Sequence, residues 1–178
     1  MARAILNLET FNMTDAPIPP QNADQSAVPA IRVMGQYIRD LSFENPNAPD
    51  SLRPGNQPSI DMSVDVRARS VNEEVFEVEL VIAAKAQRDD VAMFVAELTY
   101  AGLFQVQNLD ERAREPFLLI ECPRLIFPFA RRILADVTRD GGFPPLMLEP
   151  VDFAALYRRQ VAGQTQGAPE GTPPAGNA

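Results

Sequence analysis

The chain has 178 residues, and 46% of them are apolar, which is enough for one domain with an ordinary hydrophobic core. It carries 16 Lys and Arg against 24 Asp and Glu, so its formal net charge is −8 at pH 7. This acidity argues against nucleic acid or an anionic membrane as a partner, because binding to either requires a cationic surface. An acidic surface keeps a protein dispersed, and it also attracts basic partners.

Histidine is absent, and Lys85 is the single lysine. The missing histidine removes Ser–His and Cys–His nucleophilic pairs, imidazole metal ligands and the usual general base near neutral pH. The sequence also lacks glycine-rich phosphate loops and clusters of cysteine. We therefore expect no enzymatic activity, no metal site and no cofactor.

Cys122 is the single cysteine, so we expect no intramolecular disulfide and a reducing compartment. The first ten residues lack the apolar run of a secretory signal, and no stretch approaches the ~18 apolar residues of a membrane span. We therefore expect a cytoplasmic protein that does not insert into the membrane. With no histidine beside it, Cys122 is expected to be a core residue.

Composition divides the chain into three segments. Residues 1–30 are rich in Pro, Asn, Asp and Gln, which predicts a flexible N-terminal arm. Residues 162–178 form a low-complexity tail that we expect to be disordered. The folded domain is therefore expected over residues 31–161.

A first strand is expected over residues 33–44, where apolar and polar residues alternate. The alternation predicts two sides, one with Tyr37, Leu41 and Phe43 and the other with Asp40, Ser42 and Glu44. The connection that follows, residues 45–58, contains prolines that end the strand. Its 14 residues are long for a plain link, which indicates a crossing or functional loop.

Three further strands are expected after this loop. Residues 59–69 alternate without a break, and residues 75–86 and 91–104 follow after short polar turns, which indicates an antiparallel meander. The last of these strands is apolar on both faces, with Phe94, Ala96, Leu98, Tyr100 and Phe104 on one and Met93, Val95, Glu97 and Leu103 on the other. Such a strand indicates that both faces are covered. Either another polypeptide covers the second face, or the strand is central beneath ordinary loops.

The second half of the domain predicts helices. A helical spacing of apolar residues runs through Ile126, Phe129, Ala130, Ile133, Leu134 and Val137. Pro128 is expected to kink this helix or to mark its first turn, and Gly141 and Gly142 to end it. A shorter helix is expected from Asp152 as N-cap, burying Phe153, Leu156 and Tyr157. Four strands followed by helices predict an α+β fold.

Three long strings in this pattern closely resemble the SecB family of bacterial protein-export chaperones, and the arm looks like that of its alphaproteobacterial members. They are DLSFENPNAP at residues 40–49, CPRLIFPFAR at 122–131 and GGFPPLMLEPVDFAALY at 141–157. The resemblance extends over about residues 31–159. It implies a four-stranded antiparallel sheet with a long helix and a shorter C-terminal helix, assembled as a homotetramer that is a dimer of dimers. It also implies that the chain holds unfolded preproteins without ATP and delivers them to the translocation motor SecA.

Family members bind the basic, zinc-bearing C-terminal tail of SecA through an acidic patch, which corresponds here to Asp40, Glu44, Val95 and Glu97. Strand geometry separates Asp40 from Glu44 by roughly 13 Å. This spacing suits a charged docking surface better than an acid–base pair, whose carboxyls lie within about 5–10 Å. The alternative to a docking surface is a solvent-exposed strand face whose carboxylates have no partner.

Clients of the family bind apolar grooves between the sheet and the segment that connects the helices. The candidates here are Phe76, Phe94, Leu146, Leu148, Phe153 and Tyr157, each of which is equally well read as plain core. Two positions depart from the family. Asn56 stands where well-known members carry a groove-lining tryptophan, which puts the depth of the aromatic subsite in doubt. Ala101 replaces a glycine of a Gly-Gly pair, with a modest local effect expected.

Three other functions are weighed against an export chaperone. A SecB-like chaperone dedicated to an antitoxin or another single client is expected to lack the acidic patch. An enzyme with carboxylate chemistry needs two acids that converge in a pocket, and the sequence suggests none. In a purely structural oligomer, Asp40 and Glu44 have no partner.

Overall fold

The computed structural model describes residues 30–166, with side chains up to residue 163. All of the predicted N-terminal arm except Ala30 lies outside the described residues, as does the predicted tail from residue 167 onward. Four strands precede two helices, which confirms the predicted α+β order. The elements are β1 (Ala30–Glu44), a 3-10 turn (Asp50–Leu52), β2 (Ser59–Ser70), β3 (Val75–Arg88), β4 (Val91–Gln107), α1 (Glu111–Asp140) and α2 (Phe153–Gln166).

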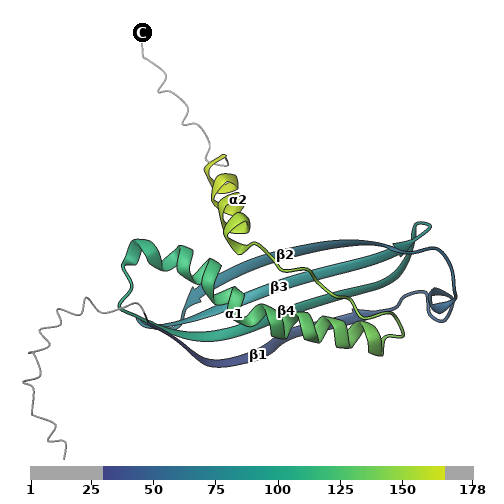
Figure 1. Cartoon of the computed structure of the whole chain (residues 1–178), viewed down its shortest axis with the longest axis horizontal. Coiled ribbons are helices and arrows are strands. Elements are labelled where there is room, and N and C mark those ends of the chain that lie inside the picture. Colours follow the sequence, from purple (N-terminus) through teal and green to yellow (C-terminus); the bar gives the residue numbers. More distant parts are fainter. Residues whose placement is uncertain (1–29, 167–178) are drawn as a thin grey trace, which may run out of the picture.

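The four strands form one antiparallel sheet in the order β1-β4-β3-β2 (Figure 1). Strands β2, β3 and β4 follow one another as the predicted meander. Strand β1 pairs with β4 instead of β2, so residues 45–58 carry the chain from one edge of the sheet to the other. The length of this connection is therefore explained by a crossing loop.

Strand β1 contains two irregularities in its pairing with β4, one between Val33 and Gly35 and one between Ile38 and Asp40. A bulge inserts one extra residue and so reverses the alternation of faces beyond it. Tyr37 is paired with Ala101 and Asp40 with Thr99, and both side chains lie on the same face of the sheet. The expectation that Tyr37 shares a side with Leu41 and Phe43 is therefore wrong, and the extra residue is Arg39.

A third irregularity lies where β3 turns into β4. Ala86 is paired with Phe94 and Gln87 with Ala92, which leaves Met93 as the extra residue. The alternation predicts Met93 on the face opposite Phe94, which is wrong, because Met93 is only 3% exposed and belongs to the core beside Phe94. The bulge provides the physical reason, because it lets two successive side chains turn inward.

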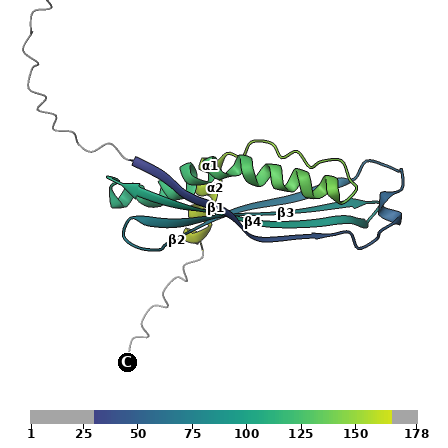
Figure 2. The same cartoon turned by 90° about the horizontal axis from the view of Figure 1, so that it is seen from below.

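Helix α1 lies across one face of the sheet, and the core fills the space between them (Figure 2). Directly opposed strand residues such as Val66, Leu80 and Tyr100 point toward α1. From the helix, buried side chains recur at a helical spacing; they are Leu118, Cys122, Ile126, Ala130 and Leu134. Phe129, expected in this stripe, is 44% exposed.

Helix α1 is much longer than the spacing of apolar residues predicted. It begins at Glu111, where the side chain of Asp110 accepts a hydrogen bond from the amide of Arg112 at 2.9 Å. Pro116, Pro123 and Pro128 all lie inside it. Each proline lacks an N–H donor, which is why the sequence indicated a shorter helix. Packing of the buried stripe on the sheet supplies the compensating stabilisation.

Helix α2 begins where the sequence predicted. The carboxylate of Asp152 accepts a hydrogen bond from the amide of Ala155 at 3.0 Å, and this bond lowers the pKa of Asp152. Phe153 is buried, and α2 packs against α1 while projecting past the β2 edge of the sheet (Figure 1). The helix continues to Gln166, past the expected end of the domain at residue 161. Within residues 30–166, no helix is both long and apolar enough to cross a membrane.

Helix α1 ends at two glycines that serve different purposes. Gly142 has a φ of +87°, a left-handed conformation that favours glycine. Gly141 has ordinary helical angles, but a Cβ there would lie 2.3 Å from the ring of Phe43 on β1. The missing side chain of Gly141 is what allows β1 to pack closely against the end of α1.

The close approach at Gly141 is tested by Gly141→Ala. We expect the variant to lose about 1–3 kcal/mol of unfolding free energy, because the Phe43 ring must move. Gly35→Ala is the matched control, since a Cβ at Gly35 meets nothing within 4 Å. Urea unfolding of both variants measures the difference. Equal stability of the two would contradict the close-packing explanation.

Candidate functional site

The sheet surface turned away from α1, here called the open face, carries the residues predicted for an acidic patch. In the ladder of β1 and β4, Glu44 is directly opposite Val95, Ser42 opposite Glu97 and Asp40 opposite Thr99. Opposed residues of an antiparallel pair point to the same face and lie about 5 Å apart. The structure therefore brings Asp40, Glu44, Val95 and Glu97 together as one surface, which we call the acidic patch.

The acidic patch is accessible and unneutralised. Asp40, Glu44 and Glu97 are exposed, and Val95 is partly buried between them. Within residues 30–166, none of the ion pairs involves these three acids. The arrangement is flat and open, which suits the docking of a basic segment and provides no enclosed site for chemistry.

The acidic patch continues toward β3 and β2. Val95 is opposite Lys85 on β3, and Lys85 is opposite Asp61 on β2. A shallow hollow of about 210 Å³ joins these residues to Glu97. Sequence reasoning missed Asp61 and Lys85 as neighbours of the patch, because the register between strands is not visible in the alternation of one strand.

The other half of the open face holds a cluster of paired charges around Glu77. Glu77 on β3 is only 2% exposed and accepts hydrogen bonds from the hydroxyl of Tyr37 and from the guanidinium groups of Arg39 and Arg69. Burial pushes the pKa of Glu77 upward, but the hydrogen bonds from Arg69 and Tyr37 and the charges of both arginines outweigh it and hold the pKa below its ordinary value. Glu77 is thus a carboxylate that stays ionised in a nearly buried position.

Ala101 on β4 lies between the two sides of this cluster. It is opposite Tyr37 on β1 and Glu79 on β3, and it is fully buried. Arg39 reaches from β1 to Glu77 and Glu79 on β3, which requires its side chain to pass over β4. The small side chain of Ala101 leaves room for this crossing. The resemblance predicts a glycine at this position, and the alanine found here lies beneath the charged cluster.

An apolar groove of about 340 Å³ lies on the side of the sheet that α1 occupies, next to the segment that connects α1 to α2. Two of the predicted client residues, Phe94 and Leu146, line it. Met147 is 61% exposed at its rim, and Gln57 and Pro58 form part of its wall. Asn56, which the resemblance places where well-known family members carry a tryptophan, directly precedes this wall and is not part of the lining.

The structure does not bring all six predicted client residues together. Phe76 lines a different hollow of about 510 Å³, between β2, the first turns of α1 and Gln160. Leu148 and Phe153 are core residues, 2% and 1% exposed, and the ring of Phe153 packs edge-on against Phe127 at 5.9 Å. Tyr157 packs against the core and lines neither hollow.

Three aromatic rings support the floor of the groove. Phe94 lies 5.0 Å from Phe143 and 5.7 Å from Phe43, measured between ring centroids. Phe43 belongs to β1, Phe94 to β4 and Phe143 to the connecting segment, so the trio joins three distant parts of the chain. Sequence reasoning expected Phe43 only on the apolar side of its strand and did not single out Phe143.

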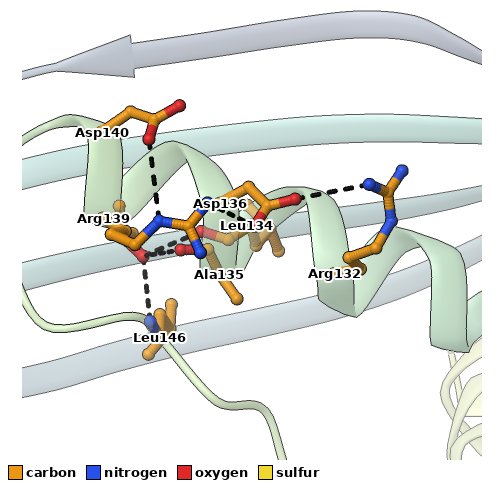
Figure 3. Close-up of polar contacts among 8 residues, drawn as sticks. Arg132, Leu134, Ala135, Asp136, Arg139, Asp140 and Leu146 are labelled. Atoms are coloured by element: carbon orange, nitrogen blue, oxygen red, sulfur yellow. Dashed lines mark hydrogen bonds and ion pairs between the residues drawn. The ribbon is translucent and has the colours of Figure 1, made fainter.

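Thr138 anchors the connecting segment to α1, and sequence reasoning missed it. Its hydroxyl accepts a hydrogen bond from the amide of Leu146 at 2.9 Å and donates to the carbonyl of Leu134 at 2.9 Å. Figure 3 shows Leu146 beside the last turns of α1, near Leu134 and Ala135. Thr138 is fully buried. The signal available in the sequence was a hydroxyl side chain, that of Thr138, within an otherwise apolar helical stripe.

The crossing loop is fixed to the hairpin between β3 and β4. The side-chain amide of Asn47 donates to the carbonyl of Ala92 at 2.9 Å, and Arg88 donates to the carbonyl of Arg53 at 2.7 Å. These bonds hold the part of the loop that leads into Gln57 and Pro58. The groove is therefore bounded by the crossing loop and the connecting segment, and both are tied to rigid elements.

The described residues bear on two further kinds of site, a metal site and a reactive thiol. Among residues 30–166, no group of acidic, cysteine or histidine side chains is arranged to hold a metal ion. Cys122 is fully buried, and desolvation, with a smaller contribution from Glu121, raises the pKa of its thiol to about 12. The thiol is therefore protonated near neutral pH, as expected for a core cysteine.

Comparison with known proteins agrees with this geometry. The family model for SecB, preprotein translocase subunit SecB, matches residues 24–164. The protein-export protein SecB of Maricaulis maris is 62% identical over 158 residues, which is 88% of this chain and 92% of the relative. The protein-export protein SecB of Caulobacter vibrioides is 47% identical over 162 residues, which is 87% of this chain and 99% of the relative.

A solved structure shares the fold at low sequence identity. It is the Mycobacterium tuberculosis Rv1957 SecB-like chaperone in complex with a ChAD peptide from the Rv1956 HigA1 antitoxin, with a TM-score of 0.56 and 19% identity. The likeness covers 68% of this chain and 90% of the solved chain. Together, the sheet-and-helix fold, the match over nearly all of the described residues and the close relatives show that the chain belongs to the SecB family of protein-export chaperones.

Proposed function

We propose that this chaperone holds unfolded preproteins in its apolar groove and delivers them to SecA, whose basic, zinc-bearing C-terminal tail docks on the acidic patch. The observation that carries the proposal is that the two sites lie on opposite faces of one sheet. Phe94 and Val95 are consecutive on β4, yet Phe94 lines the groove and Val95 belongs to the patch. A client and the motor therefore bind without competing for the same surface.

The acidic patch has the properties that a docking site for a basic tail needs. Its three exposed carboxylates form no ion pair within residues 30–166, so their charge is available to a partner. Val95 adds an apolar contact between them. Charges at the edge of an interface chiefly raise the association rate, and salt weakens their effect. We therefore propose an interaction with SecA that is sensitive to ionic strength.

The apolar groove suits segments of unfolded chain. Its lining combines aromatic rings with the exposed side chain of Met147, whose flexible thioether adapts to different partners. A single groove of this size binds a segment weakly. We propose that the chain forms a homotetramer, a dimer of dimers, so that one client contacts several grooves and gains affinity through effective concentration.

Exposed apolar side chains support self-association. Strand β1 is an edge strand, and Met34 and Ile38 on it are 56% and 47% exposed. Unpaired edge groups and apolar patches of this kind favour contact with another chain. On α1, Leu125 and Phe129 are each 44% exposed. We propose these two surfaces as contacts between subunits.

The export role is favoured over a chaperone dedicated to an antitoxin. The SecB-like chaperone solved with an antitoxin peptide is only 19% identical, so its likeness concerns the fold. The relatives at 47–62% identity are protein-export proteins, and the acidic patch is present here. We further propose that the protein acts in the cytoplasm, without an enzymatic reaction, a cofactor or direct insertion into the membrane.

The docking of SecA is tested by Asp40→Asn combined with Glu44→Gln. We expect the affinity for a zinc-loaded SecA tail peptide to fall by about two- to thirtyfold at low salt, because two exposed charges are lost and each contributes about 0.2–1 kcal/mol. Glu73→Gln with Asp140→Asn is the control, since it removes the same charge from exposed positions off the open face. Calorimetric titration measures the affinities. Equal binding by both double variants would reject the patch.

Client holding is tested by Met147→Ser at the rim of the groove. We expect weaker suppression of aggregation of an unfolded preprotein, without nucleotide, because an exposed apolar contact is lost from the groove. Val71→Ser is the control, since Val71 is also exposed (51%) but lies in the turn between β2 and β3. Light scattering measures aggregation. If the two variants protect the client equally, the groove is not the client site.

The anchor of the connecting segment is tested by Thr138→Val and Thr138→Ser. The valine variant leaves the amide of Leu146 without its partner, so we expect about 1–3 kcal/mol less unfolding free energy and weaker client holding. The serine variant keeps the hydroxyl and should retain most of both. Urea unfolding and the aggregation assay measure the two effects. Identical behaviour of the two variants would show that the hydroxyl does not anchor the segment.

A further inference from the structure

The open face of the sheet is divided into two regions of different charge. Around the acidic patch, Asp61 on β2 adds to the acids of β1 and β4, and Lys85 is the nearest cation in register. Asp65 on β2 is paired with Arg67 at 3.2 Å. From the level of Ala101 onward, two glutamates lie among three arginines, and Arg39 and Arg69 form ion pairs with them; these residues are Arg39, Arg67, Arg69, Glu77 and Glu79. The boundary between the two regions runs between Asp40 and Tyr37.

Arg39 lies at this boundary and is the cation closest in sequence to the acidic patch. It is the extra residue of the bulge, between Ile38 and Asp40, and its side chain is 47% exposed. A guanidinium next to Asp40 would neutralise one of the three carboxylates of the patch. The bulge therefore creates a competition for Arg39 between Asp40 and the acids on β3.

In the structure, Arg39 pairs with the two acids on β3. Nη1 of Arg39 lies 3.0 Å from Oε2 of Glu77 and also donates to Glu79. Both acids are more shielded from water than Asp40, since the Glu77 side chain is 2% and the Glu79 side chain 14% exposed. Ion pairs at shielded positions are weakened less by solvent.

Glu77 is itself fixed in place by groups from two other strands. Tyr37 and Arg39 approach it from β1, and Arg69 from β2. Its carboxylate therefore has little freedom to follow Arg39 toward the patch. The cluster is a fixed anchor for the long side chain of Arg39, which crosses β4 near the buried methyl group of Ala101.

We propose that Glu77 and Glu79 are positioning residues for the docking surface: they hold Arg39 over β3 and away from Asp40, which preserves the charge of the acidic patch. This inference rests on the proposed function of the patch in binding SecA. It assigns a role to a nearly buried carboxylate that touches neither the groove nor the patch.

The test begins with Glu77→Gln combined with Glu79→Gln. Both changes preserve shape and release Arg39, so we expect a roughly two- to fivefold loss of affinity for the zinc-loaded SecA tail peptide at low salt. Adding Arg39→Gln removes the released cation and should restore most of the affinity. Adding Arg69→Gln instead is the matched control, because it changes the net charge equally but removes a guanidinium that comes from β2. That variant should stay weak.

Two results would overturn the inference. One is wild-type affinity in the Glu77→Gln, Glu79→Gln variant; the other is equal rescue by Arg39→Gln and Arg69→Gln, which would reduce the effect to net charge. Should the double variant fail to fold, Glu79→Gln alone removes one of the two acids that hold Arg39, so it should give a smaller loss of affinity that Arg39→Gln again restores. Thermal unfolding and native mass confirm that each variant is intact. Failure of the patch itself appears separately, as unchanged binding by the Asp40→Asn, Glu44→Gln variant.

Discussion

The structure depends on a single sheet that α1 covers on one face only. Because side chains alternate along a strand, neighbouring residues serve opposite surfaces, and this places Phe43 and Phe94 in the core beside the groove while Glu44 and Val95 lie on the open face. Each side of the sheet thus carries its own kind of surface, apolar toward the helix and charged away from it. The proposed function requires one surface that holds a client and another that is presented to a motor, and one sheet offers two such surfaces.

The bulges in β1 decide what the open face looks like. The insertion at Arg39 allows Tyr37 and Asp40 to lie on the same face, while Leu41 remains opposite Leu98 on the face of α1. The same insertion brings an arginine next to the acidic patch, and the cluster around Glu77 takes up that arginine. The placement of the charged residues on this sheet therefore matters as much as their number. The net charge of −8 alone says little about where a basic partner binds.

The sequence predicted the order of elements, the meander, the crossing loop and the N-cap at Asp152, because each depends on a local pattern. It failed at Tyr37 and Met93, since a bulge reverses the alternation without a mark in the sequence. It predicted too short an α1, because prolines oppose a helix locally, whereas packing on the sheet stabilises the longer helix. The acids of the patch followed from a family resemblance, whereas Thr138 and Glu77 act through hydrogen bonds between distant segments, which no local pattern contains.

The central claim is that client and SecA occupy opposite faces of the sheet. Site-specific photo-crosslinking of the full-length protein tests it most directly, with the probe placed either at Ser42, opposite Glu97 on the open face, or at Met147 in the groove. With an unfolded preprotein and SecA both present, the account predicts that the Ser42 probe labels SecA and the Met147 probe labels the preprotein. Labelling of the preprotein from Ser42, or of SecA from Met147, would contradict it.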